Sequence, residues 1–162
     1  MKRTMYLVLC AVVVTAGCEA PQSTWNAAPV TMQGDRFDVQ LAPECWGGSY
    51  GCVGFHLTIN NKTEDDIEID WNKTLFIRQG QTAGGFTFEG IAYRDRNEPK
   101  NPDVVFAGSS WSKLIVPSVL VQWTGRSWIH NPMPAGDNGV YLHLRMGGEE
   151  VVQRVTLAMS RQ

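Results

Sequence analysis

The sequence predicts an all-β fold, an antiparallel β-sandwich with immunoglobulin-like architecture. Apolar and polar residues alternate with a period of two in several short runs, which is typical of strands with one buried and one solvated face. Turn signals rich in glycine and asparagine separate these runs, and no long stretch carries a helical apolar stripe. The apolar positions of the predicted strands are Phe37, Val39 and Leu41; Phe55, Leu57 and Ile59; Ile67, Ile69 and Trp71; Val140, Leu142, Leu144 and Met146; and Val155, Leu157 and Met159.

One connection is specific enough to predict a hairpin. Trp123 and Trp128 flank residues 124–127, Thr-Gly-Arg-Ser, and a four-residue loop that contains glycine is an ordinary hairpin connection. The pairing places Trp123 opposite Trp128 on one sheet face, which is a favourable aromatic cross-strand pair.

The N-terminus carries the features of an export signal. Lys2 and Arg3 give a positive start, and residues 5–14 form a run without charge. At 1.5 Å per residue, a helix of this length reaches about 15 Å, half of the hydrocarbon thickness of a bilayer. The run therefore predicts a signal peptide over residues 1–17 rather than a transmembrane helix.

The end of this signal, Thr15-Ala16-Gly17-Cys18, resembles the lipobox of bacterial lipoproteins, in which small residues precede an obligatory cysteine. The resemblance implies that the chain is cut before Cys18 and that Cys18 carries the lipid that anchors the protein to a membrane. An ordinary secretory signal, with Cys18 incidental, is the alternative. In this family an Asp after the lipidated cysteine signals retention in the inner membrane. Glu19 stands there instead, which favours the periplasmic face of the outer membrane.

The mature chain divides into two parts. Residues 18–34 lack periodicity and are rich in Ala, Pro, Gln and Thr, which predicts a flexible lipidated tether. From Asp35 onward the pattern alternates, so we expect a single β-sandwich domain over residues 35–162. Loss of Lys2 and Arg3 with the signal leaves the mature chain more acidic than the formal net charge of −2. This charge, without a basic patch, argues against nucleic acid as a partner.

Cys45 and Cys52 are the remaining cysteines once Cys18 is acylated and residues 1–17 are removed. They are close in the sequence and the expected compartment is oxidising, which predicts a disulfide. A zinc or redox pair is the alternative, but zinc needs two more ligands and a redox pair usually has two intervening residues.

An acidic run offers the one candidate metal site. On a strand, Asp66, Glu68 and Asp70 share one face, and their carboxylates are suitable ligands for calcium. Alternate residues of a straight strand are nevertheless too far apart to share one ion without other ligands. A solvated strand face is therefore the preferred interpretation, and we expect neither a metal nor another cofactor.

The histidines do not indicate a catalytic centre. His56 and His143 fall on the polar faces of predicted strands, and His130 falls in a loop. Neither the spacing of a metal pair nor that of a triad is present, so we expect a protein that is not an enzyme. A hydrolase whose site is assembled from distant loops stays open as an alternative.

The tryptophans give the best candidate binding surface. Trp71 and Trp111 suit the core, whereas Trp46 in the cysteine loop and the pair Trp123 and Trp128 are less obviously buried. Exposed tryptophan rings stack on sugars and anchor protein interfaces. Trp46, Trp123 and Trp128 are therefore the predicted binding patch.

Residues 67–117 are similar to uncharacterised bacterial lipoproteins with all-β domains, which implies location and fold and brings no activity. Together these observations predict a lipid-anchored envelope protein. Its expected role is to recruit another envelope protein as a binding or accessory module, and a glycan-binding module that uses exposed tryptophans is the main alternative.

Overall fold

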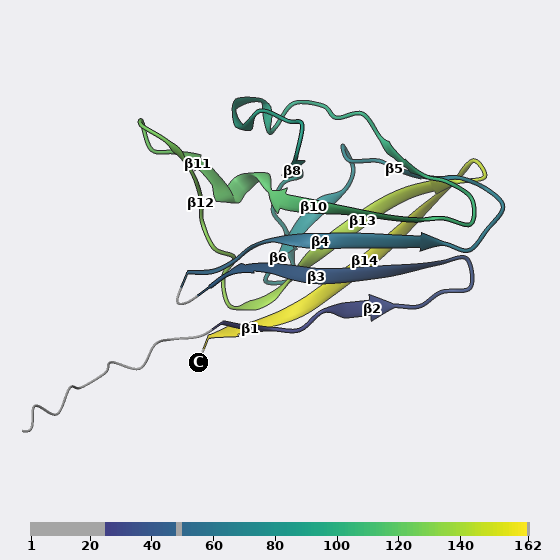
Figure 1. Ribbon diagram of the computed structural model, residues 1–162, viewed down its shortest axis with the longest axis horizontal. Coiled ribbons are helices and arrows are strands. Elements are labelled where there is room, and N and C mark those ends of the chain that lie inside the picture. The colour runs from purple at the N-terminus through teal and green to yellow at the C-terminus, as the bar shows by residue number, and fades with distance from the viewer. Residues whose placement is uncertain (1–24, 48–49, 162) are drawn as a thin grey trace, which may run out of the picture.

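A computed structural model describes residues 25–47 and 50–161, and it shows two antiparallel sheets packed face to face beside a separate hairpin (Figure 1). The predicted all-β antiparallel sandwich is confirmed, while the immunoglobulin-like connectivity stays a prediction. In the described parts of the chain the helices are two 3-10 turns, η1 (Tyr93–Asp95) and η2 (Ser118–Leu120). Within these ranges, no helix has the length and apolar character that a membrane span requires.

The first sheet is built around a pair of long strands. Its order is β1-β14-β13-β5-β9, and β6 and β7 continue from a second stretch of β13. The bounds are β1 (Trp25–Ala27), β5 (Ile67–Ile69), β6 (Leu75–Arg78), β7 (Gln81–Thr82), β9 (Asp103–Val105), β13 (Gly136–Met146) and β14 (Glu149–Arg161).

The second sheet has the order β2-β3-β4-β10-β8. A small hairpin of β11 and β12 stands apart from both sheets. The bounds are β2 (Val30–Met32), β3 (Phe37–Trp46), β4 (Gly51–Asn61), β8 (Phe86–Phe88), β10 (Ser110–Pro117), β11 (Val121–Trp123) and β12 (Trp128–His130).

The core forms where the apolar faces of the two sheets meet. The alternation read from the sequence is confirmed, because the predicted inward positions of β4, β5, β13 and β14 are buried, as are Val39 and Leu41 of β3. Phe37 packs against this core while partly exposed. Segments without a clear alternation add large side chains, namely Phe76, Phe86, Ile115 and Met133.

The predicted boundary between tether and domain at residue 35 is wrong. Strand β1 pairs with β14 in one sheet, and β2 pairs with β3 in the other. Trp25, Ala27 and Val30 pack against the core, so the domain includes residues 25–34. Each strand has three residues and lies at a sheet edge, and the chain crosses between the sheets at residues 28–29, which breaks the alternation. Cys18 and the rest of the predicted tether lie outside the described residues.

The long strands give the sandwich two distinct ends. Strand β14 begins at Glu149, beside the β13–β14 turn, and finishes at Arg161, opposite Trp25. We call these the Glu149 end and the Trp25 end. Figure 1 shows the β11–β12 hairpin and β1 both toward the left of the view, with the hairpin above and β1 and the C-terminus below.

Substitution of Gly139 tests how closely the backbones of β13 and β14 approach each other. A Cβ atom at this position would lie 2.0 Å from the carbonyl oxygen of Val155 and 2.7 Å from the Cα atom of Thr156. Backbone atoms cannot move aside cheaply, so we expect Gly139→Ala to lower the free energy of unfolding by about 3 kcal/mol or more, the upper end of typical overpacking costs.

Gly85→Ala is the matched control, because its Cβ would have its nearest neighbour at 3.9 Å. We expect a change within about 0.5 kcal/mol for this variant, as for most substitutions away from special features. Urea unfolding followed by circular dichroism measures both values, and equal stability of the two variants would contradict the packing described here.

Candidate functional site

Aromatic side chains from three separate segments meet at the Trp25 end. The ring centroids lie 5.4 Å apart for Tyr50 and Trp46, 5.3 Å for Trp46 and His130, and 5.2 Å for His130 and Tyr93. The series continues at 5.9 Å from Tyr93 to Trp128 and at 5.4 Å from Trp128 to Trp123. We call these six residues the aromatic cluster: Trp46, Tyr50, Tyr93, Trp123, Trp128 and His130.

The β11–β12 hairpin supplies one side of the cluster, and its predicted pairing is confirmed. Trp123 lies opposite Trp128 in the register. The turn is closed by the Thr124 N–H, which donates to the Ser127 carbonyl oxygen at 3.0 Å, and by the Ser127 N–H, which donates to Thr124 Oγ1 at 3.1 Å. The guanidinium of Arg96 lies 5.1 Å from the centroid of the Trp128 ring, within cation–π distance.

The loop closed by the Cys45–Cys52 disulfide supplies the other side of the aromatic cluster. Cys45 and Cys52 are paired across β3 and β4 and joined by a disulfide bond, as the sequence predicts. Trp46 and Tyr50 both lie in the loop that this bond closes. The Tyr50 hydroxyl donates a hydrogen bond to the His130 carbonyl oxygen, so the loop is fastened to the hairpin through both rings and backbone.

His130 joins the two sides. Its Nε2 atom lies 3.0 Å from the Tyr93 hydroxyl, and its Nδ1 atom is buried without a hydrogen-bond partner among the described residues. Burial lowers the pKa of His130 below its ordinary value, because the charged form loses hydration. The imidazole is therefore neutral at pH 7 and presents Nδ1 as a donor or an acceptor, depending on the tautomer.

A groove of about 660 Å³ adjoins the cluster and shares Tyr93 and His130 with it. It runs between the chain that leaves β8 and the adjacent part of β10. Its lining is mostly apolar with a few polar groups: Thr87, Phe88, Glu89, Gly90, Ile91, Ser112, Lys113, Leu114 and Val116. Thr87 is fully buried, and its Oγ1 atom is another buried polar atom without a partner among the described residues.

The groove follows an open stretch of sheet edge. Ser110 to Ile115 of β10 pair with β4 on one side, whereas β8 covers Ile115 to Pro117 on the other. No described strand pairs with residues 110–114 on the side away from β4. Unpaired backbone N–H and C=O groups at a sheet edge can form hydrogen bonds with an extended chain, which then adds to the sheet as a further strand.

The candidate nucleophiles and bases of the groove do not form a catalytic pair. Ser112 Oγ lies 3.0 Å from Thr58 Oγ1, and His130 contacts Tyr93. Lys113 Nζ contacts the Asp103 carboxylate and lies 4.2 Å from the centroid of Phe88. A nucleophile and its base must lie within hydrogen-bond distance of each other. Ser112, His130 and Lys113 are each in contact with another residue instead.

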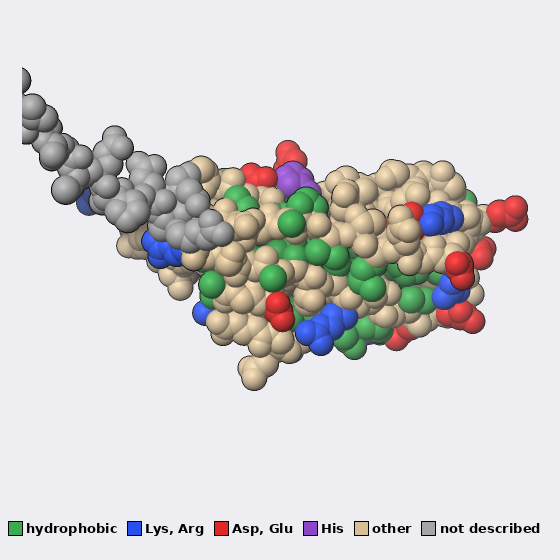
Figure 2. Space-filling view, turned by 90° about the horizontal axis from the view of Figure 1, so that it is seen from below, with side chains coloured by type: hydrophobic (Ala, Val, Ile, Leu, Met, Phe, Trp, Pro, Cys, Tyr) green, Lys and Arg blue, Asp and Glu red, His purple; other side chains and the backbone are tan. Residues whose placement is uncertain are grey.

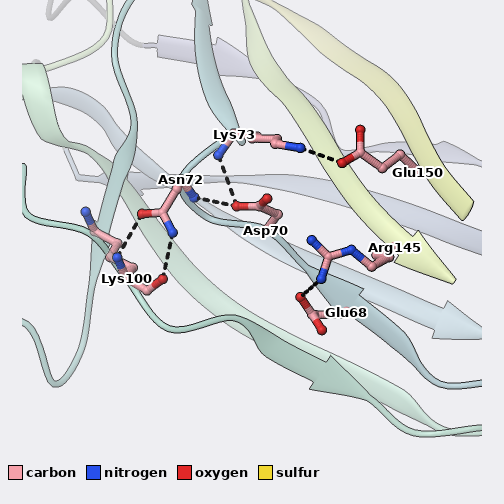
Figure 3. A network of polar contacts seen from close by, with 7 residues as sticks. All are labelled: Glu68, Asp70, Asn72, Lys73, Lys100, Arg145 and Glu150. Carbon is pink, nitrogen blue, oxygen red and sulfur yellow. Dashed lines mark hydrogen bonds and ion pairs between the residues drawn. The ribbon is translucent and has the colours of Figure 1, made fainter. Parts of the chain in front are cut away.

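The acidic run serves separate structural contacts. Glu68 forms an ion pair with Arg145 at 2.7 Å, and Asp70 accepts hydrogen bonds from the backbone N–H groups that follow it in the β5–β6 turn (Figure 3). Asp66 accepts a hydrogen bond from the Ala107 N–H at 2.9 Å. In residues 25–47 and 50–161, no group of three or more His, Cys, Asp and Glu side chains is arranged to hold a metal ion.

The structure brings the predicted patch together and enlarges it. Trp46, Trp123 and Trp128 belong to one cluster, and Trp71 and Trp111 pack in or against the core as expected. Sequence reasoning missed Tyr50, Tyr93 and the role of His130. Tyr50 had a signal, since it shares the cysteine loop with Trp46, whereas nothing in the sequence indicated that the 3-10 turn at Tyr93 contacts the hairpin.

The chain matches no protein-family model, no curated protein and no solved structure.

Trp123 and Trp71 contrast a surface ring with a core ring. Trp123 is 54% exposed, whereas Trp71 is 3% exposed and donates a hydrogen bond from Nε1 to Asp103 at 2.8 Å. We expect Trp71→Ala to lower the free energy of unfolding by about 3–5 kcal/mol and Trp123→Ala by less than about 1 kcal/mol. Thermal and urea unfolding measure the difference, and a large loss at Trp123 would make the hairpin part of the core.

Proposed function

We propose that this chain is a lipid-anchored protein of the bacterial cell envelope that binds another envelope protein and is not an enzyme. The anchor rests on the lipobox residues, Thr15-Ala16-Gly17-Cys18, and on the preceding apolar run. The binding role rests on the groove beside β10. The outer membrane is the expected site, with the domain on its periplasmic side.

The observation that carries the binding role is the unpaired edge of β10 beside the mostly apolar groove, and two residues of the groove lining also hold unsatisfied polar atoms. A buried donor or acceptor without a partner costs about 1–3 kcal/mol, so such atoms are uncommon in folded proteins. Thr87 Oγ1 and His130 Nδ1 are both in this state, and both residues line the groove.

The lining and the open edge favour an extended polypeptide. Leu114 is 39% exposed and lies with Val116 and Ile91 on the apolar lining. The adjacent edge of β10 supplies backbone donors and acceptors, and strand addition gains affinity from these while side-chain pockets give specificity. A segment with apolar residues at alternate positions has the matching chemistry.

In-cell photo-crosslinking tests the groove. A photo-reactive amino acid placed at Ile91 is expected to form one discrete adduct, and Leu114→Asp in the same chain is expected to abolish it, because a carboxylate would be buried in the interface without a partner. The same photo-reactive group at Val152, an exposed site on β14 in the other sheet, is the matched control. Equal adducts at Ile91 and Val152, or no effect of Leu114→Asp, would exclude the groove.

The anchor has its own test. Cys18→Ser removes the proposed acceptor of the lipid, so we expect loss of palmitate incorporation and release from the membrane fraction, with the same folded domain. Membrane fractionation with metabolic palmitate labelling measures both effects. Labelled palmitate in the variant would mean that Cys18 is not the acceptor.

Glycan binding is the second candidate, and the exposure of the cluster favours it. Trp46 is 44% exposed and Trp123 is 54% exposed, so their rings are accessible for stacking on sugars. Trp46 and Trp123 do not line the groove. We therefore prefer binding of a protein in the groove as the main function.

A further inference from the structure

We propose that the aromatic cluster docks on the surface of the membrane that holds the lipid anchor, so that the Trp25 end faces the bilayer and the Glu149 end points away. This inference rests on the proposed lipidation of Cys18 and names a lipid surface as the partner of the cluster.

The first step is the place where the described chain begins. Trp25 packs at the same end as the cluster, because a Cβ atom at Gly51 would lie 2.9 Å from the Trp25 ring and 3.0 Å from Cβ of Pro132. Gly51 is the register partner of Trp46, so Trp25 and this residue of the cluster are both neighbours of one glycine. In Figure 1 the hairpin lies on the same left-hand side of the view as β1, but above it.

The second step is the length of chain between this point and the anchor. Seven residue steps separate Cys18 from Trp25, and a fully extended chain of that length spans at most about 24 Å. Strand β14 alone, with 13 residues, is about 40 Å long. The Trp25 end is thus held near the lipid whatever path the intervening residues take, and the Glu149 end can lie much farther away.

The third step is the chemistry of the cluster. Tryptophan and tyrosine are enriched where a membrane meets water, because an apolar ring and a polar N–H or O–H suit the two sides of that boundary. Trp46, Tyr50 and Trp123 are each between 43% and 54% exposed. Ile129 on the hairpin is also exposed, at 37%, and adds apolar surface beside them.

The fourth step is the distribution of charge between the ends. Arg126 stands exposed in the hairpin turn, and the acidic side chains Asp95 and Glu44 near the cluster contact Arg94 and His56. The opposite end carries exposed acidic residues in two adjoining turns, of which Glu149 and Glu150 form ion pairs with Arg36 and Lys73. Figure 2 shows acidic side chains gathered at the right-hand end of the view, with basic side chains among them. The exposed acidic residues of the two turns are Glu64, Asp65, Asp66, Glu149 and Glu150.

A negatively charged lipid surface therefore repels the Glu149 end and accepts the Trp25 end. Docking in this orientation leaves the outer faces of both sheets free. The groove, which meets the cluster at Tyr93 and His130, then opens beside the membrane rather than under the domain.

Lipid-specific quenching of tryptophan fluorescence tests this orientation. The mature lipidated protein is reconstituted in vesicles of phosphatidylethanolamine and phosphatidylglycerol, with or without brominated acyl chains, which quench nearby indole rings. We expect quenching of the wild type, and about twofold lower fractional quenching of the variant Trp46→Phe/Trp123→Phe/Trp128→Phe, because these rings are placed at the interface. Trp111→Phe, which removes a ring packed against the core and away from the interface, is expected to raise the quenched fraction slightly and never to lower it.

Charge gives an independent comparison. Arg126→Glu places a carboxylate in the hairpin turn and is expected to lower the quenching about twofold on vesicles that contain phosphatidylglycerol. Arg154→Glu makes the same charge change at an exposed site midway along β14 and is expected to have no effect.

Flotation of the vesicles separates failure of docking from failure of the anchor. Wild-type protein that floats with the vesicles at high salt but shows no bromine quenching overturns the docking and leaves the anchor standing. Protein that does not float overturns both proposals. Protection of the cluster from the aqueous quencher acrylamide by isolated peptidoglycan, and not by vesicles, would overturn the docking by assigning the rings to a glycan.

Discussion

Burial of alternating apolar side chains between two twisted sheets is the constraint on which this structure depends. The long strands β3, β4, β13 and β14 direct every second residue inward, and the core that results is continuous from Val39 to Met159. The two sheets pack face to face, so the ends of the sandwich are formed by turns and by the β11–β12 hairpin (Figure 1). The candidate functional surfaces lie there and along one sheet edge, where side chains need not pack in the core.

The same constraint explains which parts of the structure were predictable from sequence. Strands of ten or more residues repeat the period of two often enough to be read directly, and the β11–β12 hairpin follows from its turn and paired tryptophans. Strands β1 and β2 were missed because each has three residues at an edge. The groove was missed because it depends on how the chain leaves β8 beside an unpaired stretch of β10, which no local pattern encodes.

In the aromatic cluster, too, some residues could be identified from the sequence and others could not. Its local members, Trp46 in the disulfide loop and Trp123 with Trp128, were identifiable as candidates from residue type and turn chemistry. Their contact with each other runs through His130 and Tyr93, which come from different parts of the chain. The disulfide contributes by fixing the loop that holds Trp46, and the hydrogen bond from Tyr50 to the His130 backbone fixes that loop to the hairpin. Contacts of this kind depend on tertiary structure and leave no periodic signal.

Tyr93 and His130 belong to both the groove and the cluster, and this has a thermodynamic consequence for the two proposals. If a polypeptide in the groove contacts His130, it acts on the ring that stacks on Trp46 and contacts Tyr93. Any change in the cluster's affinity for lipid that follows must be matched by an equal change in the groove's affinity for its ligand when the domain is docked, because binding free energies are reciprocally linked. If both proposals hold, the sharing of Tyr93 and His130 would couple partner binding to docking on the membrane without a moving domain.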